Sequence, residues 1–202
     1  VILAHYYVDE DVQDVADYIG DSFYLSKVAT KVSQDRIIFA GVEFMGESAK
    51  ILNPKKRVFM PDMNADCPMA HMADKDEILA LREKYDDLAV VCYINSTAEL
   101  KNYSDVCVTS SNAVKIVKNL PNKNIFFIPD RNLGSYVAKQ CPDKNFIFNN
   151  GCCPRHVVIT KDMVLKAKEL HPEARFAANP ECTEDIQAFE DYVGSTTGFN
   201  VY

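Results

Sequence analysis

Two cysteines that are each followed by proline are the residues of this sequence best suited to hold a metal. Cys67 comes after an apolar run at residues 57–60, and Cys153 comes after a second run at residues 145–148. A thiol at the carboxyl end of a parallel strand lies where open α/β sheets place their ligands. The proline restricts the backbone and keeps the thiol in a turn. The cysteines are 86 positions apart (153 − 67), and this repeated placement predicts two ligands of one metal centre.

Several interpretations of these thiols remain open. They could be two ordinary buried cysteines, because free cysteine is among the most buried residue types. Zinc could be bound by Cys67, Cys153 and either His71 or His156, although each histidine could equally be a hydrogen-bonded loop residue. Three cysteines from three repeated units could hold a four-iron cubane and leave one iron free as a Lewis acid. The third cysteine would then lie beyond Tyr202.

Three turns with hydroxyl side chains recur at almost the same spacing as the cysteines. They contain Ser22, Ser110 and Ser195-Thr196, and each stands at an expected helix start. A hydroxyl and the free amides of a helix start can bind phosphate or carboxylate together, although each hydroxyl could serve only as an N-cap. Three such turns that face one axis predict a shared pocket for a small polyanion.

Polar residues at the ends of three expected strands could perform acid–base chemistry. His5 and Tyr7 follow the first strand, Tyr93 follows the strand at 88–92, and Glu181 follows the strand at 175–178. The tyrosines could instead border the core, and Glu181 could be an acid favoured by a helix dipole.

Alternating strands and helices must position these groups. A first series has strands at 1–4, 36–40 and 57–60, with helices at 12–19, 22–32 and 42–52. A second series has a helix capped by Asp74, strands at 88–92, 105–108, 124–128 and 145–148, and helices at 113–120 and 133–139. A third has helices at 161–170 and 184–191 around a strand at 175–178. This alternation predicts mostly parallel sheets with helices on both faces.

The repeat predicts an α/β fold of three-layer αβα domains in a pseudo-threefold arrangement. We expect a first domain at residues 1–72, a second at 73–156, and the start of a third, incomplete domain at 157–202. The chain opens directly on an apolar run and ends soon after a motif begins, so we interpret it as part of a longer protein.

Composition excludes several classes of partner. The chain is 48% hydrophobic and 25% charged, as in ordinary globular domains. The net charge of -7 argues against nucleic acid or an anionic membrane as the main partner, and no apolar run approaches the length of a membrane span. Seven cysteines, an odd number at irregular spacing, favour a reducing compartment. We therefore expect a cytoplasmic protein with thiols available for metal.

Ten short motifs follow one another along almost the whole chain. They are His5-Tyr6-Tyr7, Gly20-Asp21-Ser22, Gly41-Val42-Glu43-Phe44-Met45, Cys67-Pro68-Met69-Ala70, Tyr93-Ile94-Asn95-Ser96-Thr97, Thr109-Ser110-Ser111-Asn112-Ala113, Pro129-Asp130-Arg131-Asn132-Leu133-Gly134, Cys153-Pro154-Arg155-His156, Asn179-Pro180-Glu181-Cys182 and Val193-Gly194-Ser195-Thr196. In type and order they resemble the quinolinate synthase family of NAD biosynthesis.

The resemblance implies an activity and a set of site residues. Enzymes of this family condense iminoaspartate with dihydroxyacetone phosphate, with loss of phosphate and water, to give quinolinate. The implied cofactor is a [4Fe-4S] cluster held by one cysteine per domain, and Cys67 and Cys153 look like two of these ligands. Tyr7, Tyr93 and Glu181 look like the catalytic groups, and an iminoaspartate-producing enzyme is the implied partner. The substrate contacts carried over by motif are His5, Ser22, Tyr93, Ile94, Asn95, Ser110, Asn179, Pro180, Glu181, Ser195 and Thr196.

Two departures from the family pattern matter. The usual His-Pro-Glu reads Asn179-Pro180-Glu181 here, and asparagine can hydrogen-bond a carboxylate but cannot carry a proton or a positive charge. The family's C-terminal segment, with the third ligand, is absent, so we expect this 202-residue chain to be inactive alone. The alternatives are a non-catalytic anion-binding α/β protein without a cluster and, less directly, a zinc-dependent aldolase or hydrolase.

Overall fold

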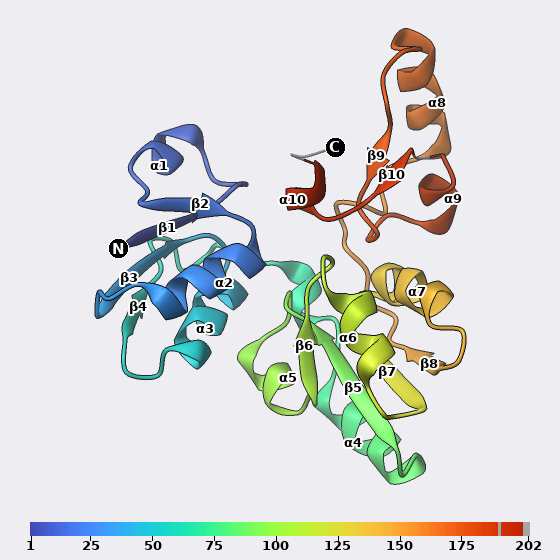
Figure 1. The fold of residues 1–202 in the computed structure, drawn as a ribbon, viewed down its shortest axis with the longest axis horizontal. Helices are drawn as coiled ribbons and strands as arrows, with labels where there is room; N and C mark the ends of the chain where they lie inside the picture. Colours follow the sequence, from blue (N-terminus) through green and yellow to red (C-terminus); the bar gives the residue numbers. More distant parts are fainter. Residues whose placement is uncertain (190, 200–202) are drawn as a thin grey trace.

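The first group of elements forms a four-stranded parallel sheet with three helices. In this computed structural model, which describes residues 1–189 and 191–199, the group takes up the N-terminal part of the chain (Figure 1). Its elements are β1 (Ile2–His5), α1 (Glu10–Asp14), β2 (Tyr18–Gly20), α2 (Ser22–Lys31), β3 (Arg36–Ala40), α3 (Glu43–Leu52) and β4 (Arg57–Phe59). The strands lie in the order β2-β1-β3-β4.

The second group repeats this sheet order and forms a three-layer sandwich. Its elements are α4 (Lys75–Lys84), β5 (Leu88–Tyr93), α5 (Ala98–Asn102), β6 (Val106–Val108), α6 (Ala113–Asn119), β7 (Asn124–Ile128), α7 (Arg131–Gln140) and β8 (Asn145–Phe148). The order is β6-β5-β7-β8. Successive side chains of a strand point to opposite faces, so Phe127 packs with Leu133 of α7 while Phe126 packs with Ile78 of α4. The expected α/β fold with parallel sheets is confirmed.

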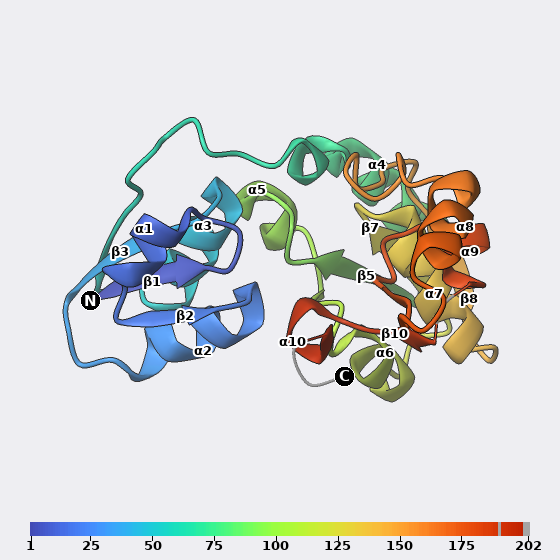
Figure 2. The ribbon, with the colours of Figure 1, turned by 90° about the horizontal axis from the view of Figure 1, so that it is seen from above.

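The third group is smaller. It contains α8 (Lys161–Leu170), β9 (Ala177–Ala178), α9 (Glu184–Gln187), β10 (Tyr192–Val193) and α10 (Thr196–Phe199). The two strands pair in parallel, in the order β10-β9. In Figures 1 and 2, α10 extends from this group toward the first. The first two groups thus share a four-strand order, and the two strands of the third match its first pair, whereas the pseudo-threefold axis and the domain boundaries stay predictions.

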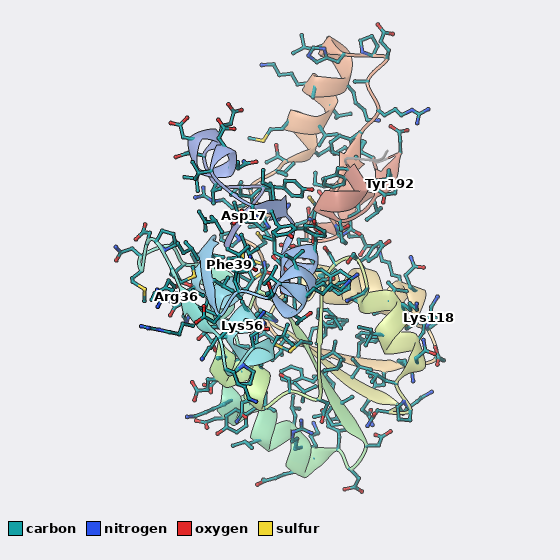
Figure 3. The ribbon with its side chains drawn as sticks, turned by 60° about the vertical axis from the view of Figure 1, so that its left-hand side comes forward. Asp17, Arg36, Phe39, Lys56, Lys118 and Tyr192 are labelled. Carbon is teal, nitrogen blue, oxygen red and sulfur yellow. The ribbon has the colours of Figure 1, made fainter. Side chains whose placement is uncertain are left out.

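One aspartate device recurs in all three groups. Asp17, Asp105 and Asp191 each precede the second strand of their group. Figure 3 labels Asp17 and Tyr192, the residue that follows Asp191. The Asp17 carboxylate accepts a hydrogen bond from the Ile2 amide at 2.7 Å, and its own amide donates to the Ile2 carbonyl at 2.9 Å. Asp105 makes the same pair of bonds with Val90, and Asp191 makes them with Phe176. These bonds turn the chain from a short helix into an edge strand.

This device explains two wrong predictions of secondary structure. The helix expected at 12–19 ends at Asp14, and Tyr18–Gly20 is strand β2. The helix expected at 184–191 ends at Gln187, and Tyr192–Val193 is strand β10. Of the apolar side chains that suggested the first helix, Val12, Val15 and Ile19 are exposed and Ala16 is half-buried, so a helix here would have no core to pack against. The two hydrogen bonds between Asp17 and Ile2 therefore determine the local structure, and the chain forms a strand.

The connection between β4 and α4 carries the first Cys-Pro motif. It crosses from the first group to the second (Figure 2) and contains a 3₁₀ helix at Pro68–His71. Met69 and Ala70 of this turn are buried in the cores of the second and first groups, respectively. The connection therefore fixes Cys67 between the two sheets. Among the described residues, no helix is both long and apolar enough to cross a membrane.

Candidate functional site

A cavity of about 830 Å³ lies where strands of all three sheets end. Its lining contains twelve of the residues that the sequence predicts for the site: His5, Tyr7, Ser22, Cys67, Tyr93, Ile94, Asn95, Ser110, Cys153, Asn179, Glu181 and Ser195. Pro180 is not part of this lining; its carbonyl accepts a hydrogen bond from Gln187 at 2.9 Å. The Thr196 side chain lies outside the part of the chain that the structure describes.

The two thiols of the Cys-Pro motifs reach this cavity from different sheets. Cys67 comes from the β4–α4 connection and Cys153 from the loop after β8, and both are free. Burial raises the pKa of Cys67, and nearby Cys153 and Glu181 raise it further, while the amides of Met69 and Ala70 lower it. The Cys67 thiol therefore keeps its proton in the absence of metal, and a metal ion would displace that proton when it binds the sulfur. The two thiols thus offer a metal two sulfur donors.

Tyr93 and Glu181 form a buried hydrogen-bonded pair in the cavity. The Tyr93 hydroxyl, at the end of β5, donates to Glu181 Oε1 at 2.6 Å, and the side chains come from different sheets. Burial raises the pKa of Tyr93 well above its usual value, and the negative charge of Glu181 adds to this shift. Tyr93 therefore stays protonated and donates its hydrogen to Glu181, whose carboxylate can accept a proton.

A possible metal-binding group surrounds Cys153. One donor atom each of Cys153, His156 and Glu181 lie within 4.8 Å of one another. His156 Nδ1 lies 3.4 Å from Glu181 Oε2, yet it is buried and has no hydrogen-bond partner among the described residues. Burial lowers the pKa of His156, but Cys153 and Glu181 outweigh it and raise the pKa to about 10. Sulfur, nitrogen and oxygen donors that converge in this way fit a metal cofactor, which would displace the proton of His156 on binding.

The two histidines that the sequence could not separate lie in different surroundings. His71 does not line the cavity; its Nε2 lies 2.7 Å from Asp66 Oδ2, and its side chain is half-exposed. His156 lines the cavity. Of the two candidate nitrogen donors for zinc, the geometry therefore favours His156.

His5 and Tyr7 stand together at the end of β1. The Tyr7 amide donates to His5 Nδ1 at 3.2 Å, and the two rings meet edge to face with centroids 4.6 Å apart. Burial lowers the pKa of His5 to about 4, although Asp21 acts to raise it. His5 is thus a neutral imidazole at pH 7. Tyr7 is 74% exposed and lies at the rim of the cavity.

The hydroxyls of two of the three predicted turns do not cap a helix. The N-cap of α2 is Asp21, whose carboxylate accepts from the Tyr24 amide at 2.8 Å. Within the described residues the hydroxyls of Ser22 and Ser110 have no hydrogen-bond partner, whereas Ser195 Oγ accepts from the Gly198 amide at 3.4 Å. The first two hydroxyls are therefore available to a ligand in the cavity.

Asn179 shapes the turn that carries Glu181. Its Oδ1 atom accepts a hydrogen bond from the Glu181 amide at 3.0 Å, and both side chains are buried. A short side chain that accepts from the amide two residues on stabilises such a turn. The asparagine at the family's usual histidine position thus has a positioning contact that needs neither a proton nor a charge.

Two further residues, Asp130 and Arg155, belong to the motifs of the sequence analysis but had no predicted role. Asp130 is fully buried, and burial together with the charge of Glu181 raises its pKa to about 7. Arg155 is the one lysine or arginine in the lining formed by the described residues. Asp130 follows Pro129 and Arg155 follows Pro154, each inside one of the ten motifs. That position in a motif is the feature of the sequence that could have indicated a role for them.

Comparisons with known proteins identify the family of this chain. The family model described as NadA, quinolinate synthetase A protein, matches residues 1–202. A quinolinate synthase of Fusobacterium nucleatum is 61% identical over 98% of this chain and 66% of its own length. Those of Caldicellulosiruptor saccharolyticus (53% identical; 97% and 65%) and Clostridioides difficile (48%; 100% and 66%) are also similar. The chain thus spans just under two thirds of the curated relatives it matches. It belongs to the quinolinate synthetase A protein family.

Proposed function

We propose that the complete protein is a quinolinate synthase of NAD biosynthesis. It would condense iminoaspartate with dihydroxyacetone phosphate and release quinolinate, phosphate and water. The observation that carries the proposal is the meeting, in one cavity, of two thiols from two sheets with the buried Tyr93–Glu181 pair. The relatives named quinolinate synthase support it across nearly the whole chain.

We infer that the cofactor is a [4Fe-4S] cluster with Cys67 and Cys153 as two of its ligands. The free thiols on one cavity and the unsatisfied His156 nitrogen fit a metal group there. The third cysteine would come from the part of the family's length that this chain does not span. When bound, such a cluster supplies an iron that is open to substrate oxygens as a Lewis acid.

The cavity offers groups that suit two anionic substrates. Arg155 can pair with a phosphate or carboxylate through two parallel N–H bonds. The free hydroxyls of Ser22 and Ser110 can donate to further anionic oxygens, and neutral His5 can donate without adding charge. We infer that these residues orient the two substrates against each other, because a condensation needs its reacting carbons in contact.

Proton transfer would fall to the buried acid pair. Formation of the ring requires removal of protons from carbon and protonation of leaving oxygens. Glu181 is placed to accept a proton, and the Tyr93 hydroxyl bonded to it can stabilise the carboxylate and orient it. Tyr7, at the exposed rim, can exchange protons with solvent. The two tyrosines would therefore serve different stages, one buried and one accessible.

An iminoaspartate-producing enzyme is the partner that this chemistry needs, because a free imine hydrolyses in water. All seven cysteines are free thiols, which is compatible with the expected reducing compartment. The cytoplasmic location stays a prediction.

The experiment measures quinolinate formation by the complete chain, purified anaerobically and supplied with both substrates. We expect a brown, oxygen-sensitive protein that forms quinolinate, and a 202-residue chain that is inactive because it lacks the third cysteine ligand of the cluster. Zinc in place of iron would favour the zinc-dependent alternative, in which Cys67, Cys153 and a histidine hold the ion. Anion binding with neither metal would favour a non-catalytic protein. Equal turnover by the 202-residue and complete chains would contradict the three-cysteine proposal.

A further inference from the structure

The start of α7 is bonded to both loops that carry the central groups of the cavity. Asp130 caps α7, and its Oδ1 atom accepts from the Leu133 amide at 2.8 Å. Its Oδ2 atom accepts from the distant Cys153 amide at 2.9 Å. Two residues on, the Asn132 side-chain amide donates to the backbone carbonyl of Glu181 at 3.0 Å. One helix start therefore contacts the Cys153 loop and the Glu181 loop.

Asp130 differs from the other side-chain caps of the described helices. Asp21, Asp74, Thr97 and Thr160 each accept from an amide close by in their own helix, and all are half-buried or exposed. Asp130 is 0% exposed, and both of its oxygens accept hydrogen bonds. A buried carboxylate is costly, and an exposed side chain suffices for capping. Capping alone therefore does not explain why this aspartate is buried.

The backbone of the Cys153 loop is packed tightly against the same helix start. The Arg131 amide donates to the Gly151 carbonyl at 2.8 Å, and the Gly151 amide donates to Asn149 Oδ1 at 2.6 Å. A Cβ atom at Gly151 would lie 2.4 Å from the Pro129 carbonyl oxygen, so a larger residue would push the loop away. Because the loop is held this closely, the hydrogen bond that the Cys153 amide donates to Asp130 sets the direction of Cys153.

We propose that Asp130 is a positioning residue for the metal cofactor: its carboxylate holds the Cys153 amide so that the thiol stays directed into the cavity. Asn132 holds the Glu181 loop from the same helix start, so the metal ligand and the catalytic carboxylate share one rigid support. This inference rests on the proposed function for the identity of the cofactor. Residues that orient metal ligands typically contribute about 10- to 100-fold to metal affinity or activity.

The test compares Asp130→Asn with Asp74→Asn in the complete chain, purified anaerobically. An asparagine at 130 can still cap Leu133 through its oxygen, but it turns an NH₂ group toward the Cys153 amide. Asp74 also caps a helix, yet it lies outside the cavity lining, so the matched change makes the same Asp-to-Asn replacement at a cap remote from the site. We expect the chelator concentration that removes half of the iron to fall about 10- to 100-fold in Asp130→Asn and to stay unchanged in Asp74→Asn.

A second measurement works without any cluster. In the metal-free chain, the rate at which iodoacetamide alkylates Cys153, followed by mass spectrometry, reports how firmly the loop is held. We expect Asp130→Asn to alkylate faster at Cys153 and at an unchanged rate at Cys67. Asn132→Ala, which frees the Glu181 carbonyl alone, should keep its iron affinity and lose kcat. If Asp130→Asn fails to fold, Asp130→Ser replaces it, because serine can cap Leu133 without reaching Cys153.

The outcomes separate this inference from the proposed function. Equal iron affinity and equal alkylation of Cys153 in Asp130→Asn and Asp74→Asn would overturn the positioning role. A complete chain that binds no iron at all would sink the proposed cofactor. Faster alkylation of Cys153 in Asp130→Asn would, in that case, still support the positioning of the loop.

Discussion

At the scale of single residues, the Tyr93–Glu181 hydrogen bond is the contact on which the proposed chemistry depends most. The bond is 2.6 Å long, and both side chains are buried away from water. Tyr93→Phe keeps the ring but leaves one carboxylate oxygen without its donor, so the proton acceptor loses its orientation. We expect kcat to fall about 100-fold with little change in KM, as for loss of a positioned acid–base group.

Steady-state kinetics of the complete chain would check this expectation. Tyr85→Phe is the matched control, because Tyr85 precedes the opposite end of the same strand and lies outside the cavity lining. A Tyr93→Phe enzyme with the kcat of Tyr85→Phe would exclude the pair from the chemistry.

The buried His5 predicts a specific dependence on pH. Its pKa is about 4 in the folded protein and 6.5 when exposed, so the unfolded chain binds this proton first as pH falls. The contribution of His5 to the free energy of unfolding is complete above pH 6.5 and is lost progressively down to pH 4, by about 3 kcal/mol in total. NMR should show one of the four histidines titrating near pH 4.

His5→Asn provides the control, because its side-chain oxygen can still accept from the Tyr7 amide. The resonance near pH 4 should disappear, and stability between pH 6.5 and 4 should fall less steeply than in the unchanged protein. A His5 resonance that titrates near 6.5 would contradict the burial of this side chain in the neutral form.

The sequence could predict which residues end the strands but not how their side chains meet. Cys67, Cys153 and Tyr93 were accessible to prediction because each follows an apolar run. The role inferred for Asp130 depends on its burial and on a hydrogen bond from Cys153, 23 positions away. Neither can be predicted from the residues next to Asp130 in the sequence. Spacing could not distinguish His71 from His156 for the same reason.

At the scale of elements, lysines hold the C-terminal ends of two equivalent helices. Lys56 Nζ donates to the carbonyls of Ala29 and Val32 at the end of α2 at 2.8 and 2.6 Å (Figure 3). In the second group Lys144 Nζ donates to the carbonyls of Leu120 and Asn122, just beyond the end of α6, at 2.6 and 2.9 Å. A cation at this end satisfies free carbonyls and the helix dipole.

We expect Lys56→Met to lower the free energy of unfolding by about 1.5–3 kcal/mol, the usual contribution of hydrogen bonds to a charged group. The adjacent Lys55 is exposed, so Lys55→Met should change stability by less than about 0.5 kcal/mol. Urea unfolding of both variants measures the difference. Equal losses in the two variants would mean that the bonds of Lys56 to α2 contribute nothing beyond surface charge.

Most helices and strands were predictable because their apolar period matches their burial, as in the fully buried β5. Strands β2 and β10 were missed because their partners determine them. A comparison of the repeated units could have found both: Asp17-Tyr18-Ile19-Gly20 and Asp191-Tyr192-Val193-Gly194 are nearly the same four letters, and each sits before a hydroxyl turn.

At the scale of the whole molecule, the repeated sheets account for one cavity that residues of all three groups line. Parallel strands of one order present their carboxyl ends at the same edge, and the residues that follow β1, β5 and β9 line one space. The proposed cluster requires this assembly, because Cys67 and Cys153 belong to segments that no single sheet could bring together.

The iron and acid-labile sulfide content of four anaerobically purified complete chains tests this claim most directly. We expect the unchanged protein to contain a [4Fe-4S] cluster, with its characteristic EPR signal after reduction, and Cys67→Ser and Cys153→Ser each to lose it. Cys141→Ser, at a buried cysteine outside the cavity lining, should retain the full content. A cluster that survives in Cys67→Ser or in Cys153→Ser would contradict the account, because the two thiols would then not share one metal centre.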